Sequence, residues 1–135
     1  MTRSKTIIAA ALAASIGSAG FAVPASAGGS ISINVTPKNA KEEQAMKAGL
    51  AIYGIVNAVK SGSIKQLGNG NAAGLAQLGS GNFGVIHQEG DNHNGTLTQN
   101  GNGNSYGIFQ FGKGTNANVA QNGNGGTGAT FAFGW

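Results

Sequence analysis

The sequence predicts an all-β repeat fold, a β-solenoid in which short strands stack in layers, with a short helix before the repeats. Three observations lead to this prediction. Glutamine recurs at every eleventh position, an aliphatic residue stands two positions before each glutamine, and glycine stands two positions after it. A fixed period of this kind is the signature of a repeat architecture. The glutamines are Gln66, Gln77, Gln88, Gln99, Gln110 and Gln121.

Six 11-residue units fill residues 61–125, and each unit predicts one strand and one turn. The shared pattern is N-x-(A/G)-x-(I/L/V)-x-Q-x-G-x-G. Its first four defined positions are two apart, so their side chains lie on one face of an extended strand. The glycine pair supplies the positive φ angles of a tight turn. The expected aliphatic core is Ile64, Leu75, Ile86, Leu97, Ile108 and Val119.

Alternate units resemble one another more closely than adjacent units do. The aliphatic residue is Ile in the first, third and fifth units, but Leu, Leu and Val in the other three. This alternation favours a 22-residue strand-turn-strand layer that is repeated three times. Stacked layers of this kind form two facing, parallel, in-register sheets of the cross-β type, with about 4.8 Å between layers and about 10 Å between sheets.

Interior amides need partners, because an unpaired buried amide costs roughly 1–3 kcal/mol. In an in-register stack, each amide donates to one neighbouring layer and accepts from the other. The six glutamines, together with Asn71, Asn82 and Asn104, are therefore predicted to form amide ladders. Only the ladder ends and the edges of the terminal strands stay unpaired, and such edges are templates for strand addition. The predicted partner is a second copy of this chain.

Residues 1–27 have the features of a secretory signal peptide. Arg3 and Lys5 precede an apolar, alanine-rich run, and the sequence Ala-Ser-Ala at 25–27 has the form of a cleavage site. The alternative is a single membrane anchor, but serine and glycine interrupt the run. We expect a secreted chain that begins at Gly28 and has no transmembrane segment after cleavage.

Residues 28–60 are predicted to form an extended arm followed by a helix over 39–60. Ile31, Ile33 and Val35 alternate with polar residues, and Pro37 ends the arm. Asn39 and Glu42 form an N-terminal capping pattern, and apolar residues then follow at helical spacing. Two placements of this helix are open. It packs over the first layer, or it covers a sheet edge and delays self-association.

Charge is sparse in the repeats, and it identifies candidate gatekeepers. The formal net charge of +4 falls to +2 without Arg3 and Lys5, and no basic stripe suggests nucleic acid. Glu89, Asp91 and His93 gather around the third unit. They are either solvated surface or turn side chains, or gatekeepers that slow premature aggregation.

No catalytic or cofactor-binding constellation is present in the sequence. The chain has no cysteine, and its two histidines, His87 and His93, are poorly spaced for a metal site. We therefore expect no enzyme, no metal and no cofactor.

Residues 126–135 are predicted to form a final aromatic strand. The repeat register calls for an aliphatic residue and glutamine at positions 130 and 132, where Thr130 and Ala132 stand. Phe131, Phe133 and Trp135 alternate instead. These aromatics either cap the solenoid or dock onto a partner.

Units such as 71–81 (NAAGLAQLGSG) and 82–88 (NFGVIHQ) resemble the curlin repeat of curli, the extracellular functional amyloid fibres of bacteria. The resemblance extends over all six units. It implies export through a dedicated outer-membrane channel, a related nucleator subunit as partner, and surface fibres that support adhesion and biofilm. It also implies that the inward Gln and Asn side chains control polymerisation.

The resemblance leaves the type of subunit open. Family subunits often have five 22-residue repeats, whereas three are clear here, and their early mature segment is usually flexible and rich in glycine. The nearly charge-free, regular repeats favour the major fibre-forming subunit over the minor nucleator. A monomeric β-solenoid adhesin or ice-binding module is the alternative outside this class. Such a module needs a flat outward row of Thr or aromatic residues, and the repeats form no such row.

Overall fold

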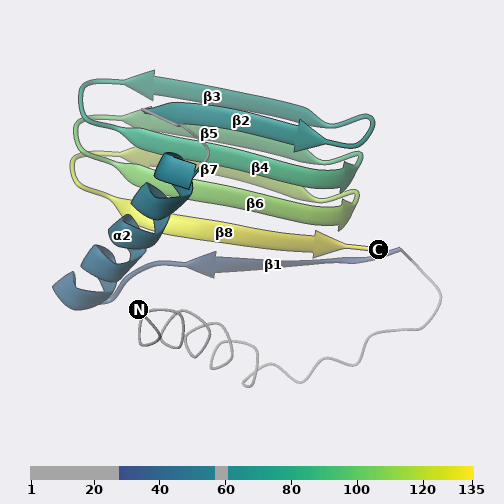
Figure 1. The fold of residues 1–135 in the computed structure, drawn as a ribbon, viewed down its shortest axis with the longest axis horizontal. Coiled ribbons are helices and arrows are strands. Elements are labelled where there is room, and N and C mark those ends of the chain that lie inside the picture. Colours follow the sequence, from purple (N-terminus) through teal and green to yellow (C-terminus); the bar gives the residue numbers. More distant parts are fainter. Residues whose placement is uncertain (1–27, 57–60) are drawn as a thin grey trace.

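The computed structural model describes residues 28–56 and 61–135, which form a β-solenoid with one helix (Figure 1). The predicted signal peptide lies outside the described residues. We call the five-stranded sheet, with strand order β1-β8-β6-β4-β2, sheet A, and the three-stranded sheet, with order β3-β5-β7, sheet B. The elements are β1 (Ser30–Val35), α2 (Ala40–Val56), β2 (Gly62–Leu67), β3 (Ala72–Leu78), β4 (Phe83–Asp91), β5 (Asn94–Asn100), β6 (Ser105–Lys113), β7 (Asn116–Asn122) and β8 (Thr127–Gly134).

The parallel strands are stacked in register, with a step of 22 residues. In sheet A, Gln66 pairs with Gln88 and Gln88 with Gln110. In sheet B, Gln77 pairs with Gln99, which pairs with Gln121. The predicted fold class, a solenoid of strand-turn-strand layers with two facing parallel sheets, is confirmed.

The core lies between the two sheets, where the aliphatic columns meet. Ile86, Leu97 and Ile108 are fully buried there. The sheets are staggered, since a Cβ placed on Gly84 of β4 would lie 3.0 Å from methyl groups of both Leu75 in β3 and Leu97 in β5. Each interior strand therefore packs between two strands of the facing sheet.

Glycine at the turns serves both backbone conformation and close stacking. Gly90 has a φ of 125°, and a Cβ there would lie 1.9 Å from the carbonyl oxygen of Gly112 in the next layer. No side chain fits at that distance. Two residues later, Asn92 replaces the second glycine with a φ of 59°, a region that asparagine tolerates.

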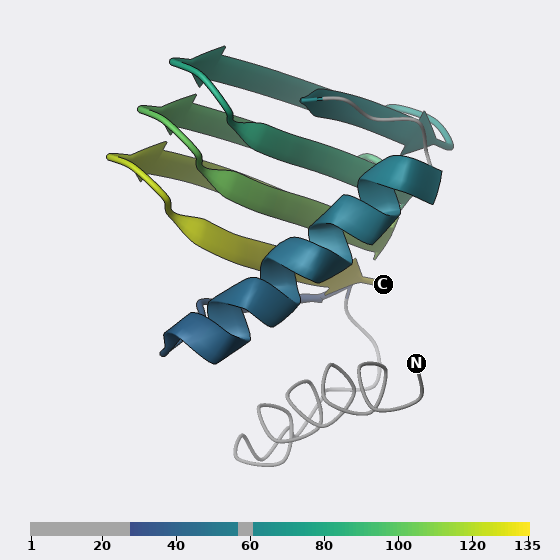
Figure 2. The same ribbon diagram turned by 60° about the vertical axis from the view of Figure 1, so that its left-hand side comes forward.

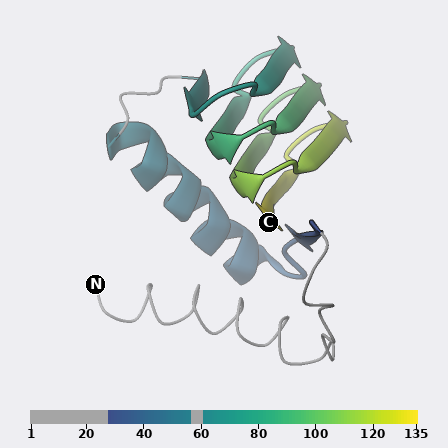
Figure 3. The same ribbon diagram turned by 90° about the vertical axis from the view of Figure 1, so that its right-hand side faces the viewer.

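The segment before the repeats contacts the C-terminal part of the solenoid. Strand β1 pairs antiparallel with β8, so that Ile31 lies opposite Phe133 and Val35 opposite Ala129. Helix α2 crosses the outer face of sheet A and contacts β6 and β8 (Figures 2 and 3). Neither predicted placement of the helix describes this arrangement, because the helix covers a sheet face and β1 covers the edge.

The predicted capping pattern starts the helix. Asn39 Oδ1 accepts a hydrogen bond from the backbone N–H of Glu42 at 2.9 Å, and Glu42 accepts one from the N–H of Lys38 at 2.8 Å. The helix extends from Ala40 to Val56. The remainder of the predicted range, residues 57–60, lies outside the described part of the chain.

Strand β8 is a seventh strand of the solenoid and keeps the repeat register. Thr130 stacks on Ile108 and Ala132 on Gln110, although neither residue fits the repeat pattern. Phe131 and Phe133 lie on the outer face of sheet A, where their rings stack on those of Phe109 and Phe111 with centroids 5.1 and 5.5 Å apart. They extend an aromatic column along that face instead of covering the end of the solenoid.

Candidate functional site: the amide ladders and the ends of the solenoid

The glutamines form two ladders, one in each sheet. In sheet A, Gln66 Nε2 donates to Gln88 Oε1 at 2.9 Å, and Gln88 Nε2 donates to Gln110 Oε1 at 2.8 Å. In sheet B, Gln77 donates to Gln99 and Gln99 to Gln121, both at 2.8 Å. Both ladders donate towards the C-terminal layers, so the solenoid has a polarity.

Each interior amide also ties its own sheet to the facing one. Gln88 Nε2 donates to the carbonyl oxygen of Ala72 at 2.9 Å, and Gln99 Nε2 donates to that of Phe83 at 3.0 Å. Both glutamines are fully buried. The side-chain N–H groups and the amide oxygen of both glutamines have hydrogen-bond partners. Their burial therefore does not carry the free-energy cost of an unpaired amide.

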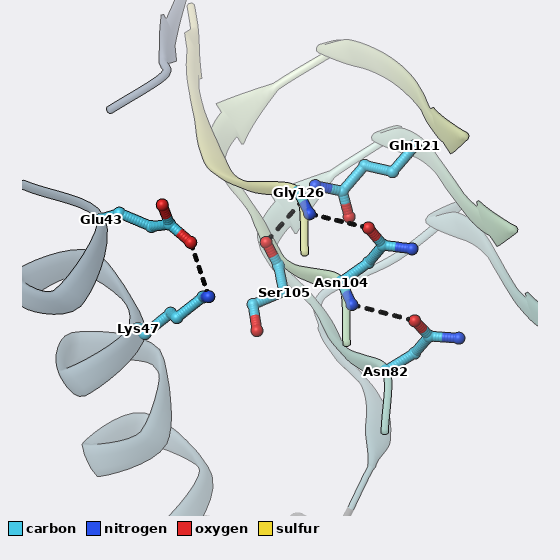
Figure 4. A network of polar contacts seen from close by, with 7 residues as sticks. All are labelled: Glu43, Lys47, Asn82, Asn104, Ser105, Gln121 and Gly126. Atoms are coloured by element: carbon cyan, nitrogen blue, oxygen red, sulfur yellow. Dashed lines mark hydrogen bonds and ion pairs between the residues drawn. The ribbon is translucent and has the colours of Figure 1, made fainter. Parts of the chain in front are cut away.

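The ladders end differently in the two sheets. In sheet A, Gln110 Nε2 donates to the Thr115 hydroxyl at 2.9 Å, and the next residue in register is Ala132. In sheet B, Gln121 Nε2 reaches the carbonyl oxygen of Ser105 at 3.5 Å (Figure 4), the longest of the glutamine-to-carbonyl bonds. Among the described residues, no further glutamine lies beyond Gln121. Its ladder is therefore open at this end.

The predicted asparagines form a second set of ladders at the turns. Asn82 Oδ1 accepts the N–H of Asn104 at 3.0 Å, and Asn104 Oδ1 accepts the N–H of Gly126 at 2.9 Å (Figure 4). Asn71 Oδ1 accepts the N–H of His93 at 3.0 Å. Each asparagine thus bonds to the layer that follows.

His93 belongs to this asparagine column, which corrects its description as a solvated side chain. It is buried, and its Nδ1 lies 2.8 Å from the hydroxyl of Thr115 in the next layer. Its Nε2 lies 3.3 Å from the carbonyl oxygen of Glu89. An imidazole can replace the asparagine here because it reaches partners in its own layer and in the next.

The two acidic gatekeeper candidates have different surroundings. The Glu89 side chain is 60% exposed on the outer face of sheet A, 3.6 Å from His87 Nε2. Asp91 lies at the turn, where its Oδ1 accepts the N–H of Asn69 at 3.0 Å. Asp91 is therefore both a charge and a structural hydrogen-bond acceptor.

Sequence reasoning missed that the turn position of Asp91 accepts hydrogen bonds from the preceding layer. At the equivalent turn position, Asn102 Oδ1 accepts the N–H of Ser80 at 2.9 Å, and Asn124 Oδ1 accepts the N–H of Asn102 at 2.8 Å. The signal was the polar residue between the two positive-φ turn positions of each unit, which are both glycine except for Asn92 in the third unit.

The predicted aliphatic core is exposed at the first layer. Ile64 is 42% exposed, whereas Ile86 and Ile108 in the same column are buried. Leu75 and Val119, at the two ends of the sheet B column, are partly buried. The neighbouring surface is also apolar, since Leu67 is 46% and Leu78 is 72% exposed.

The two ends of the solenoid therefore differ. At the first end, β2 and β3 are both edge strands. At the other end, β7 is an edge strand in sheet B, while β8 in sheet A is covered by β1. Among the described residues, three of the four terminal solenoid strands thus have an unpaired edge. This arrangement is chemically suited to strand addition in register.

Other kinds of site find little support in the described residues. Residues 28–56 and 61–135 contain no group of three His, Cys, Asp or Glu side chains placed to hold a metal ion. The described helix is too short and too polar to cross a membrane. Comparisons with protein families, with curated proteins and with solved structures give no significant match to this chain.

Proposed function

We propose that this chain is a secreted structural protein that self-assembles into extracellular amyloid fibres of the curli type, which serve surface adhesion and the biofilm matrix. The observation that supports the proposal most directly is the open amide ladder. Gln66 and Gln77 present amide oxygens at one end, and no described residue donates to them. Gln121 presents an N–H at the other end.

The unpaired strand edges make the same ends adhesive. A strand that adds to β2, β3 or β7 gains a full set of backbone hydrogen bonds and covers apolar side chains such as Ile64 and Leu78. Strands β3, β5 and β7 have no charged residue, so added layers of sheet B bring no like charges together. The added copy is then equivalent to a further set of layers.

The likeness to the curlin repeat supports the cellular part of the proposal. It implies Sec export directed by residues 1–27, passage through an outer-membrane channel, and a related nucleator subunit that starts the fibre. Within this class we favour the major subunit, because the ladders are regular from Gln66 to Gln121. The minor nucleator is the alternative.

A monomeric solenoid adhesin is the second candidate, and strand β1 favours it. By pairing with β8, β1 covers one strand edge that a polymerising chain needs free. A monomer of this kind would expose sheet B as its binding face, with Thr96, Thr98 and several asparagines pointing outward.

Thioflavin T fluorescence of residues 28–135, followed over time, separates the two candidates. This segment contains every described helix and strand. For a fibre subunit we expect sigmoidal growth that preformed fibres seed, and diffraction from the product at about 4.8 and 10 Å. A soluble monomer that keeps its β-structure and does not respond to seeds would contradict the fibre proposal and support the adhesin.

A further inference from the structure

The number of strands in the solenoid dictates how two copies fit together. Strands β2 to β8 are seven successive strands that alternate between the sheets, so sheet A contributes four layers to the solenoid and sheet B three. Because the number of strands is odd, the last strand of sheet A, β8, has no corresponding strand of sheet B in its layer. The final layer is half complete.

Direct translation of a second copy along the axis leaves a gap. If β2 of the second copy pairs with β8, then β3 of that copy lies two layers beyond β7, with one strand position empty between them. The void would be one strand wide, about 4.8 Å. The N–H of Gln121 would face this void, and Gln66 of the second copy would stack on Ala132, which offers no hydrogen bond.

Rotation of the second copy by half a turn removes the gap. The rotation exchanges the positions of the two sheets and reverses the strand directions, so that β2 of the second copy runs parallel to β7. It fills the empty position in sheet B, and β3 of the second copy then pairs with β8. The alternation of strands between the sheets continues across the junction without interruption.

Side chains match in sheet B in this arrangement, whereas in sheet A Gln77 of the second copy stacks on Ala132, as Gln66 does in simple translation. The eleven-residue register places Gln66 of the second copy on Gln121 and its Ile64 on Val119. Gln121 Nε2 then donates to the Gln66 amide oxygen, which no described residue reaches within a single chain. The ladder of sheet B thereby continues into the second copy with the same polarity.

We infer that a second copy of this chain adds after a half turn about the solenoid axis, pairing its β2 with β7 and its β3 with β8, and that β1 leaves the edge of β8 to admit it. The inference rests on the proposed fibre function. Strand β1 occupies the position of the incoming β3, so it acts as a strap over half of the junction. The β7 edge is free to make the first contact.

Paired pyrene labels test the junction, because the chain has no native cysteine. In the half-turn arrangement, Leu67 of one copy lies beside Asn122 of the next, and Leu78 lies beside Phe133. In simple translation, Leu67 lies beside Phe133. Single variants Leu67→Cys, Leu78→Cys, Asn122→Cys and Phe133→Cys of residues 28–135 are labelled with pyrene maleimide and mixed in pairs before assembly.

We expect excimer emission from fibres with the 67/122 and 78/133 pairs, and none with the 67/133 pair. Fibres with one labelled variant alone serve as the control for lateral contacts. Excimer emission from 67/133, or from none of the three pairs, in fibres that do form would overturn the half-turn junction. Emission from 67/122 without 78/133 would overturn the release of β1. Failure of the unlabelled chain to form fibres would instead contradict the proposed function.

Helical symmetry measured by electron cryomicroscopy provides a readout that needs no substitution. Seven strands correspond to three and a half layers, so the half-turn junction predicts a rise of about 17 Å and a rotation near a half turn for each subunit. Simple translation predicts a rise of about 19 Å without that rotation. A fibre with the second symmetry would overturn the inference even if every labelled variant failed to assemble.

Discussion

Sheets A and B share the same pattern of inward side chains, but their outer faces differ in how far they are covered. In sheet A, outward Val85 of β4 is as fully buried as inward Ile86. Helix α2 crosses the outer face of this sheet (Figure 2). In sheet B, β5 alternates between buried and exposed positions. The inward residues therefore specify the solenoid, and the outward residues specify what covers it.

The outward side chains also differ in chemistry. Sheet A presents the aromatic column of His87, Phe109 and Phe131, which Tyr53 of the helix contacts. Every charged side chain of the repeats belongs to a strand of sheet A, namely Lys65, Glu89, Asp91 and Lys113. Apart from Leu78, the outward side chains on the strands of sheet B are small or polar and uncharged. One sheet is built to be covered, and the other is left open.

Gln99→Ala, compared with Thr98→Ala, should give the largest effect, because the two residues are neighbours on β5 but face opposite ways. The Gln99 substitution removes one rung, leaves a cavity and takes a partner from Gln77 and Gln121. We expect it to lower the free energy of unfolding by about 2–4 kcal/mol and to slow fibre growth severalfold. Thr98→Ala should cost about 0.5 kcal/mol or less.

Urea unfolding of the monomer and thioflavin T growth curves measure the two effects. Both variants shorten a polar side chain on the same strand, so their difference isolates the inward position. Equal destabilisation by the two substitutions would contradict the view that inward and outward columns have separate roles. Growth of Gln99→Ala at the wild-type rate would show that the ladder is not needed for addition.

A glycine-to-alanine pair tests the outer faces directly. A Cβ on Gly107 in sheet A would lie 2.8 Å from Leu50 Cδ2 of the helix and 2.6 Å from the Phe109 ring, whereas a Cβ on Gly74 in sheet B would lie 3.8 Å from Thr96 Cγ2. We expect Gly107→Ala to destabilise the chain by about 1 kcal/mol through crowding. Gly74→Ala should stabilise it by about 0.4–1 kcal/mol, because alanine restricts the unfolded chain.

Relative to the wild type, the urea midpoint should fall for Gly107→Ala and rise for Gly74→Ala. Gly107→Ala in a Leu50→Ala background, compared with Leu50→Ala alone, provides the control: its cost should be smaller there, since the contact with the helix side chain is gone and only that with Phe109 remains. If Gly107→Ala were as stabilising as Gly74→Ala, the helix would not cover sheet A in solution.

The sequence predicted the inward columns correctly because they depend on local periodicity. The eleven-residue step, the turn glycines and the face shared by Ile86 and Gln88 all follow from spacing along one unit. The pairing of β1 with β8 could not be predicted in this way. It joins Ile31 to Phe133, about a hundred residues apart, and alternation alone does not name a partner.

The position of α2 had a signal that was not used. Outward positions of the odd units include Val85, Phe109 and, in β8, Phe131, whereas those of the even units, apart from Leu78, are small or polar. That contrast indicates which sheet is covered. The role of His93 had a weaker signal, since only its place in the asparagine column marked it as buried.

Alkaline pH should lower the stability of the chain through sheet A, which has an inward tyrosine, Tyr106. The three strands of sheet B have no inward titratable group. Burial raises the pKa of Tyr106 above its ordinary value of 10.0, and the hydrogen bond with Thr130 partly opposes this. The folded chain keeps the phenol proton that the unfolded chain releases. The buried, neutral Tyr106 therefore makes its full contribution to the free energy of unfolding below about pH 10, and this contribution is lost as the pH rises further.

Urea midpoints of the wild type and Tyr106→Phe, measured at pH 8 and at pH 11, isolate this group. We expect the wild type to lose more stability than the variant over this interval, although lysine titration affects both. A larger loss in Tyr106→Phe would contradict the assigned direction.

The smallest expected effect comes from removing the negative charges of sheet A in the variant Glu89→Gln with Asp91→Asn. Asparagine at position 91 keeps the acceptor for the N–H of Asn69, as Asn102 does for Ser80, so the turn ladder persists. Only charge is lost. If these side chains act as gatekeepers, the lag of assembly should shorten about twofold, which corresponds to about 0.4 kcal/mol in the barrier. Thr98→Ser in uncharged sheet B is the control, and a longer lag in the charge variant would show that the carboxylates assist assembly instead.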